Sequence, residues 1–229
     1  MKKLNLRTKS HRQYIEIPVD FIDQYMPQAS EGAVKIYLYL LRAAAESFGC
    51  DVFCFGAVKD DRSLISNALQ TCLEAADVVL ISGGSSAGAK DMTVDLLGEL
   101  GTVHFHGIAM KPGKPTIFAT VGQKPVFGLP GHPLAAYFVF RLIVSEYLRA
   151  LLGLPQDRPI ARCPLAVNIP SNHGREEYLC VTFDENGGIV PLHTKSGIIS
   201  VLQSAEGFLR IPRDAEGLLA GTLTEVFAL

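Results

Sequence analysis

Residues 77–91 of the chain read DVVLISGGSSAGAKD, and this stretch decides the fold. It begins with a short apolar run rich in valine, leucine and isoleucine, and a glycine-rich turn follows directly. Short apolar runs that contain β-branched residues and end at glycine are typical of buried parallel strands. Glycines leave backbone N–H groups accessible, and a helix that starts after the turn favours a bound anion at its N-terminus. The stretch therefore predicts an α/β fold with an anion-binding turn at a strand end.

Two further turns follow the same plan: residues 110–115 read MKPGKP and residues 128–133 read GLPGHP. The first turn adds the carboxylate of Asp91, and the second adds the ammonium groups of Lys111 and Lys114. Backbone donors, a carboxylate and ammonium groups together favour a phosphorylated ligand held with a divalent cation. Any one of these turns could be an ordinary tight turn. The three of them in close succession favour a ligand site.

Composition bounds the class of protein. The chain has 229 residues, of which 48% are hydrophobic and 19% are charged, so it can bury a core. Its net charge of −2 gives no global signature of a nucleic-acid partner or an anionic membrane. No apolar run is long enough for a membrane span, and residues 1–9 are basic without an apolar signal core. Together with five cysteines expected to be reduced thiols, this predicts a cytoplasmic protein.

The sequence pattern changes twice along the chain. Residues 1–42 begin with a polar, basic arm, whereas residues 43–154 alternate between strand-like and helix-like segments. After a proline-rich linker at 155–159, the chain alternates short strands with turns up to residue 229. The middle region predicts an open, mostly parallel sheet covered by helices. Residues 159–229 predict a small β-barrel-like domain.

Individual elements can be predicted from periodicity and turn signals. Asp61 is expected to cap a helix that runs to about residue 75, and Gly122 is expected to form a hairpin with Gln123. Further helices are expected at 93–100 and 133–152. Strands are expected at 13–17, 51–55, 78–81, 103–108, 116–120, 125–128, 160–168, 176–183, 189–191, 207–211 and 223–229.

These motifs, in this order, resemble those of the molybdopterin molybdenumtransferase family, which includes the enzymatic half of gephyrin. The resemblance covers residues 43–229, and it implies an α/β cofactor-biosynthesis domain followed by a C-terminal β-barrel-like domain. The residues that carry it are Asp60-Asp61-Arg62, the SGGxSxGxxD motif at 82–91, KPGKP at 111–115, GLPGHP at 128–133, Gly174-Arg175, SGII at 196–199 and Gly207-Phe208.

The resemblance implies a reaction in which molybdate is inserted into adenylylated molybdopterin and AMP is released. It implies that Asp60, Asp91 and Lys111 are catalytic, that Asp60 and Asp91 also bind Mg²⁺, and that the protein is a homodimer. The cofactor-binding residues that it implies are Gly83, Gly84, Ser86, Gly88, Lys114, Pro130 and Gly131. Asp61 is more simply a helix cap, Asp91 could also be one, and Lys114 could be a solvated turn lysine.

The chain departs from the family pattern before residue 51. The family's α/β domain opens with a strand that ends in a Thr-Gly-Asp-Glu-type turn, and an Asp-Ser-Asn-type turn precedes its first helix; neither occurs here. The family's large N-terminal portion has no counterpart either. A buried backbone group that loses its partner strand costs about 1–3 kcal/mol. We therefore expect a substitute strand, for which residues 13–17 are one candidate, or a partner chain, and we expect an impaired activity.

Residues 14–42 resemble instead the N-terminal winged-helix segment of DnaD-type replication-initiation proteins. The matching residues are IPxxFIxxYMP at 17–27 and VKIYLYLLR at 34–42. A partial winged helix lacks its recognition helix, so we expect no nucleic-acid partner. Two alternatives to the transferase remain: a non-catalytic molybdopterin-binding or scaffolding protein, and a DNA-replication module.

Overall fold

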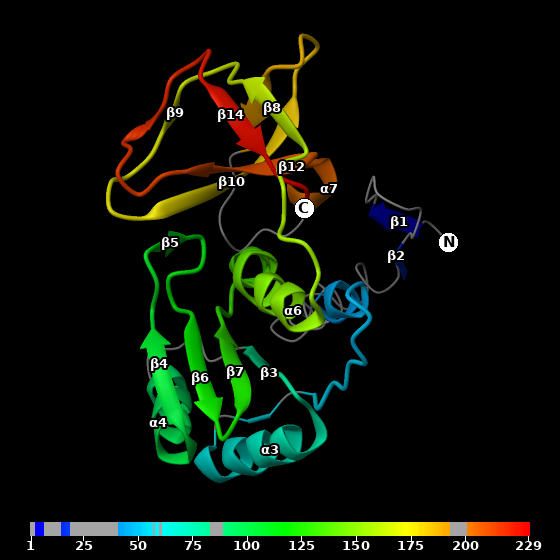
Figure 1. Ribbon diagram of the computed structural model, residues 1–229, viewed down its shortest axis with the longest axis vertical. Helices are drawn as coiled ribbons and strands as arrows, with labels where there is room; N and C mark the ends of the chain where they lie inside the picture. The colour runs from blue at the N-terminus through cyan, green and yellow to red at the C-terminus, as the bar shows by residue number, and fades with distance from the viewer. Residues whose placement is uncertain are drawn as a thin grey trace.

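The computed structural model describes residues 3–6, 15–18, 41–56, 58–59, 61–82, 89–192 and 201–229. Two parts follow one another along the chain, and Figure 1 shows an α/β part below a β-rich part, with helix α6 (Ser145–Leu152) between them. No helix in the described ranges combines the length and the apolar character that a membrane span requires.

The α/β part is built on a four-stranded sheet. Its strands lie in the order β3 (Val79–Ser82), β7 (Lys124–Leu129), β6 (Ile117–Val121) and β4 (Thr102–His106). β3 and β7 are parallel, whereas β6 is antiparallel to both β7 and β4. The hairpin predicted at Gly122, where φ is +61°, brings β7 back beside β6. The α/β class is confirmed, and among the described strands the sheet is mixed, with β3–β7 as its parallel pair.

Helices cover both faces of this sheet. On one face, α3 (Arg62–Ala75) and α4 (Ala89–Leu100) enclose a core of Leu69, Val79, Leu97, Ile117, Ala119 and Val126. On the other face lies the predicted long helix, formed by α5 (Pro133–Val139), the π-helical segment η1 (Phe140–Val144) and α6, which closes at Gly153 in the left-handed conformation. Neighbouring residues of β7 therefore face different cores, since Val126 lies in the first and Phe127 in the second.

The strand predicted at 51–55 is wrong, because these residues have no regular secondary structure. Val52 packs against the core, but Phe53 and Phe55 are 64% and 46% exposed. A strand forms only where its backbone groups find a partner, and β3 pairs with β7 alone among the described strands. Residues 51–55 pair with no described strand, the outer side of β3 included, and they therefore stay irregular.

The described part of residues 1–42 includes one small antiparallel pair, β1 (Lys3–Leu6) and β2 (Ile15–Pro18). β2 overlaps the strand predicted at 13–17. Its described partner is β1, so the pairing does not extend the sheet at β3. Of the winged-helix-like segment expected over residues 14–42, residues 19–40 lie outside the described residues.

The C-terminal part is rich in short strands, as expected. They are β8 (Ala161–Pro164), β9 (Ile169–Pro170), β10 (Glu176–Phe183), β11 (Ile189–Pro191), β12 (Gly207–Ile211), β13 (Gly217–Leu218) and β14 (Leu223–Val226), with the short helix α7 (Val201–Ser204) before β12. The described strands pair as β11-β10-β12, β13-β9 and β14-β8. They enclose a core of Leu165, Ile169, Val181, Ile189, Leu209, Ile211 and Val226.

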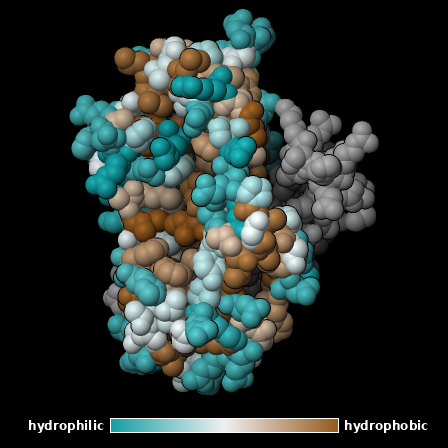
Figure 2. Space-filling view, viewed as in Figure 1, coloured by the Kyte–Doolittle hydropathy of each residue, from teal (hydrophilic) through white to brown (hydrophobic). Residues whose placement is uncertain are grey.

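One short strand of the α/β part is added to the sheet of the C-terminal part. β5 (Met110–Lys111) leaves the α/β part in the connection between β4 and β6, and it pairs in parallel with β10 of the C-terminal part. Figure 1 shows β5 directly below β10, and Figure 2 shows apolar side chains gathered at the level where the two parts meet. β5 was not predicted, because its partner lies far away in the sequence.

Asp61 caps α3 as predicted. Its carboxylate accepts hydrogen bonds from Ser63 N at 2.9 Å and from Leu64 N at 3.0 Å, and the Ser63 hydroxyl donates to it as well. These bonds, with that of the Ser63 side chain first, lower the pKa of Asp61.

Asp61→Asn tests this cap through its pH dependence. A carboxyl whose pKa is lowered by folding stabilises the fold above its ordinary pKa of about 3.9, and this contribution is lost as the pH falls through the folded value. Asparagine caps helices nearly as well but does not titrate. In urea unfolding at a series of pH values, the wild-type chain should be the more stable above about pH 4, and the difference should shrink below it. A difference that does not change with pH would contradict this account.

Candidate functional site

The three glycine-rich turns start from one edge of the sheet. Ser82, at the end of β3, lies opposite Leu129 at the end of β7. Ile117 opens β6 opposite Gly128, and it also pairs with His106 at the end of β4. The carboxyl ends of β3, β7 and β4 therefore share an edge with the amino end of β6. In α/β folds, ligands bind outside the carboxyl ends of the strands.

The described residues cover part of the predicted site. Asp60, Gly83, Gly84, Ser86 and Gly88 lie outside them. The backbone of Asp91 lies in the first turn of α4, which begins at Ala89 rather than at residue 93, and its side chain lies outside the described part. Pro130 is buried and Gly131 half-buried at the end of β7, just before α5. Their position follows from the pairing of β7 with β3.

The second turn is tightly folded. Thr116 is fully buried, and its hydroxyl donates a 2.6 Å hydrogen bond to the carbonyl of Gly113. Gly113 has φ of +128°, and a Cβ there would lie 2.4 Å from Cε of Met110, so glycine is required. Met110 itself is 6% exposed and packs in the core beside the long helix. The backbone that carries Lys111 and Lys114 is therefore held in one shape.

The two lysines of this turn differ in their surroundings. Lys114 is exposed, which fits a solvated turn lysine as well as a ligand contact. Lys111 reaches the C-terminal part, where its Nζ lies 2.6 Å from Oε1 of Glu177. The Lys111 side chain remains 49% exposed, whereas that of Glu177 is 8% exposed. A lysine ammonium has three N–H donors, so this ion pair leaves donors of Lys111 available for a ligand.

Glu177 was not among the site residues predicted from the sequence. Its signal was a pair of adjacent acids, Glu176 and Glu177, at the start of a predicted strand. Successive side chains of a strand point to opposite faces, so one of the two acids faces inward, where an acid is rarely buried unless it is paired. Its second oxygen, Oε2, accepts a 2.6 Å hydrogen bond from the hydroxyl of Ser171. Which lysine would pair with it depends on how the two parts of the chain meet, and the sequence alone does not indicate that.

The described residues give no metal centre. Within them, no group of three or more His, Cys, Asp or Glu side chains could hold a metal ion. His104, which alternates with His106 on β4, lies 2.9 Å from the hydroxyl of Thr120 and stacks on Phe118. Both predicted Mg²⁺ ligands, Asp60 and Asp91, have side chains outside the described part, so their role stays a prediction.

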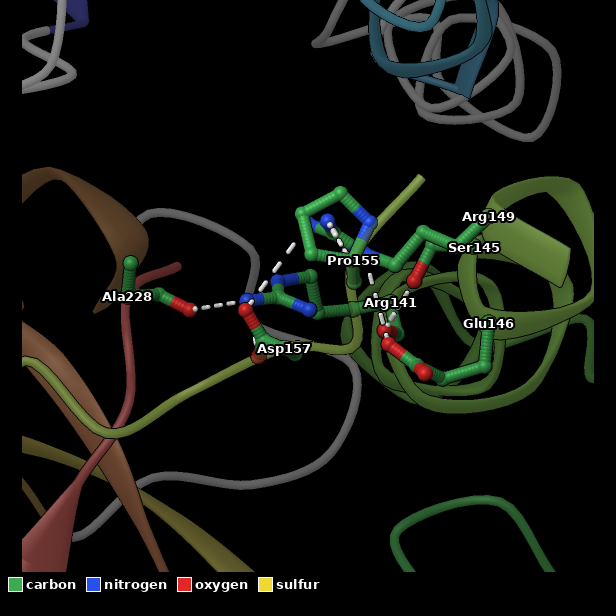
Figure 3. A network of polar contacts seen from close by, with 7 residues as sticks. All are labelled: Arg141, Ser145, Glu146, Arg149, Pro155, Asp157 and Ala228. Atoms are coloured by element: carbon green, nitrogen blue, oxygen red, sulfur yellow. Dashed lines mark hydrogen bonds and ion pairs between the residues drawn. The ribbon is translucent and has the colours of Figure 1, made fainter. Parts of the chain in front are cut away.

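A polar network fastens the linker and the C-terminus to the long helix (Figure 3). Arg141 donates to Oδ2 of Asp157 at 2.6 Å and to the carbonyl of Ala228 at 3.0 Å. Arg149 donates to the carbonyl of Pro155 at 3.0 Å and lies 3.3 Å from a carboxylate oxygen of Glu146. These contacts hold the C-terminal part against α6, and so they also hold β10 where β5 can pair with it.

Beside this network lies a cavity of about 440 Å³ between the long helix and the C-terminal strands. Arg141, Tyr178, Phe208 and Arg210 are among its lining residues. Burial and a hydrogen bond to Glu176 raise the pKa of Tyr178, so its hydroxyl stays protonated. Of the predicted site residues that the structure describes, none lines this cavity. The cavity is therefore separate from the described part of the edge where the glycine-rich turns begin.

Arg141→Met tests whether this network supports the fold. The side chains of Arg141 and Asp157 are 13% and 22% exposed. The substitution removes the 2.6 Å partner of a largely buried carboxylate and leaves it only the longer, 3.7 Å contact with Arg149. Hydrogen bonds to charged groups contribute about 1.5–3 kcal/mol, and we expect the free energy of unfolding in urea to fall by about 2 kcal/mol.

The matched control is Arg42→Met. Arg42 pairs with Glu46 one helical turn away, and both side chains are about half exposed. Exposed pairs at this spacing contribute little, about 0.3–0.5 kcal/mol. If the free energy of unfolding falls equally in the two variants, the linker network contributes no more to stability than an exposed ion pair does.

Comparison with known proteins accounts for both parts of the chain. Residues 37–150 match the family model described as "Probable molybdopterin binding domain". Residues 162–229 match the model described as "MoeA C-terminal region (domain IV)". The boundary between the two matches falls at the linker that the Arg141 network fastens.

Individual relatives agree with this assignment. A putative molybdopterin biosynthesis protein of Methanocaldococcus jannaschii is 34% identical over 192 residues, which are 83% of this chain and 46% of the relative. Molybdopterin molybdenumtransferase 2 of Mycobacterium tuberculosis is 31% identical over 199 residues, which are 83% of this chain and 49% of the relative. The crystal structure of the molybdopterin biosynthesis moeA protein from Pyrococcus horikosii superposes with a TM-score of 0.71 at 34% identity, covering 83% of this chain and 46% of that one. The chain thus spans about half the length of the curated relatives it matches.

Proposed function

The chain belongs to the molybdenum-cofactor biosynthesis family that these two domains define, and from this premise we propose that it inserts molybdate into adenylylated molybdopterin and releases AMP. The observation that carries the proposal is the common edge at which the three glycine-rich turns begin. A nucleotide-linked pterin has phosphate oxygens to be held, and glycine-rich turns at strand ends supply the backbone donors for them.

The roles of the residues follow from their chemistry. Backbone N–H groups of Gly83, Gly84 and Gly88, with the hydroxyl of Ser86, would hold the phosphate or pterin. Pro130 and Gly131 would border the ligand on the β7 side, where β7 ends beside β3. The ammonium groups of the two lysines of the second turn, Lys111 and Lys114, would compensate the anionic oxygens of the substrates.

Asp60 and Asp91 are the proposed Mg²⁺ ligands. Two carboxylates together with phosphate oxygens form the all-oxygen donor set that Mg²⁺ prefers. When bound, the ion would offset the negative charge that the substrates bring together. Exchanging one anionic ligand for another depends on donors fixed in advance more than on a strong acid or base. The chain's own contribution is therefore to bind and orient.

The C-terminal match favours the molybdenumtransferase over a non-catalytic scaffold or a replication module. The similarity of residues 14–42 to DnaD-type proteins stays a prediction. We also propose that the protein works as a homodimer in a reducing compartment, the cytoplasm. The free thiols of its five cysteines suit such a compartment.

Lys111→Met tests ligand binding. We expect the affinity for adenylylated molybdopterin, measured by isothermal titration calorimetry, to fall about tenfold to a hundredfold, because a charge-assisted hydrogen bond contributes about 1.5–3 kcal/mol. The matched control is Lys124→Met. Lys124 opens β7 at the opposite end of the strand, where its Nζ donates to the carbonyl of Leu73. An equal loss for both lysines, or none for Lys111, would count against the proposed site.

Asp91→Ala tests the metal role. We expect molybdate insertion to become nearly undetectable at a Mg²⁺ concentration that saturates the wild-type chain, and to recover in part when Mg²⁺ is raised. Asp95→Ala is the control, since Asp95 is exposed one turn further along α4. If Asp91→Ala keeps full turnover and an unchanged Mg²⁺ dependence, Asp91 is a helix residue and not a ligand.

A further inference from the structure

Glu177 is a buried carboxylate at the junction of the two parts. It lies on β10 of the C-terminal part, and the residue as a whole is 6% exposed. Each of its oxygens has a partner. Oε1 lies 2.6 Å from Nζ of Lys111, and Oε2 accepts a 2.6 Å hydrogen bond from Ser171. Ser171 and Glu177 belong to the C-terminal part, whereas Lys111 comes from the α/β part.

The pairing of the backbone strands places Lys111 and Glu177 opposite one another. In the parallel pair of β5 and β10, Lys111 lies opposite Glu177 and Met110 opposite Glu176. Glu176 N donates a 2.9 Å hydrogen bond to the carbonyl of Ala109, and Met110 is anchored in the core of the α/β part. The position of the Lys111 side chain therefore depends on both parts of the chain.

A buried carboxylate needs this partner more than the exposed lysine does. Removing one member of a buried ion pair leaves an uncompensated charge, which is strongly unfavourable. Glu177 therefore restrains the flexible four-carbon stem of Lys111, a side chain that otherwise loses much rotamer freedom on being fixed. A ligand that meets an ammonium already held in place loses less entropy on binding.

We propose that Glu177 is a positioning residue: through it, the C-terminal part holds the Lys111 ammonium at the sheet edge so that its remaining N–H donors face an oxyanion of the ligand. The identity of that ligand rests on the proposed function, whereas the coupling of Glu177 to Lys111 does not. Glu177 itself touches the lysine and not the reacting atoms. This gives the C-terminal part a direct share in ligand binding.

The first test needs no ligand. NMR spectra of lysine ammonium groups, with the Lys111 signal assigned by its loss in Lys111→Met, report how firmly each ammonium is held. We expect a distinct, slowly exchanging Lys111 signal in the wild-type chain. It should persist with a shift in Glu177→Gln, which can still accept a hydrogen bond, and broaden or vanish in Glu177→Asp, whose carboxylate is one methylene shorter.

Glu176→Gln is the matched control. Glu176 accepts a hydrogen bond from the hydroxyl of Tyr178 and lies 3.6 Å from Arg210, whereas Lys111 pairs with Glu177. The Lys111 signal should therefore be unchanged in this variant. A Lys111 signal that is the same in the wild type, Glu177→Gln, Glu177→Asp and Glu176→Gln would overturn the proposal.

The second test is a double-mutant cycle with adenylylated molybdopterin as the probe. In the wild-type background, Glu177→Asp should weaken binding about tenfold, a change of about 1.4 kcal/mol, and Glu177→Gln should weaken it less. In the Lys111→Met background, neither substitution should change the affinity. Coupling of this kind is the signature of one residue that acts through another.

The outcomes distinguish a failure of the positioning role from a failure of the proposed function. If Glu177→Asp weakens binding equally in both backgrounds, Glu177 acts on the fold or on the ligand directly, and the proposal is wrong. Full affinity in Glu177→Asp is equally contrary to it. If the wild-type chain does not bind the probe, the proposed function fails, and the ammonium spectra still decide whether Glu177 holds Lys111.

Discussion

The parallel pairing of β5 with β10 is the constraint on which the rest of the structure depends. It makes one turn of the α/β part a strand of the C-terminal sheet, so the two parts cannot move independently without breaking it. The Lys111–Glu177 ion pair lies in the same register, and the Arg141 network fastens the other side of the junction. The backbone pairing, the ion pair with a buried carboxylate and the linker contacts thus all hold the α/β part and the C-terminal part in the same relative position.

This placement joins the two parts that match the two family models. The glycine-rich turns belong to the α/β part, and their strands converge on one edge. Among the described residues, the C-terminal part supplies no strand of that sheet and none of the three glycine-rich turns, yet it contacts the second turn through backbone and side chain. It therefore serves as a support that fixes the turn, rather than as an independent module attached by the linker.

Much of the fold could be predicted because its signals are local. β10, β11 and β12 have the bounds read from the sequence, and the cap at Asp61, the Gly122 hairpin and the long helix follow from turn and capping rules. What the sequence could not indicate depends on distant partners. The segment at 51–55 reads as a strand but pairs with no described strand, and β5 and Glu177 acquire their roles only when the two parts meet.

The most direct test of the account is a crystal structure of the chain with adenylylated molybdopterin bound. The account predicts phosphate oxygens of the ligand at the sheet edge, within hydrogen-bond distance of Lys111 Nζ and beside Pro130 and Gly131, with the Lys111–Glu177 pair intact. Ligand density in the cavity beside Arg141 and Phe208 instead, with Lys111 contacting Glu177 alone, would contradict it.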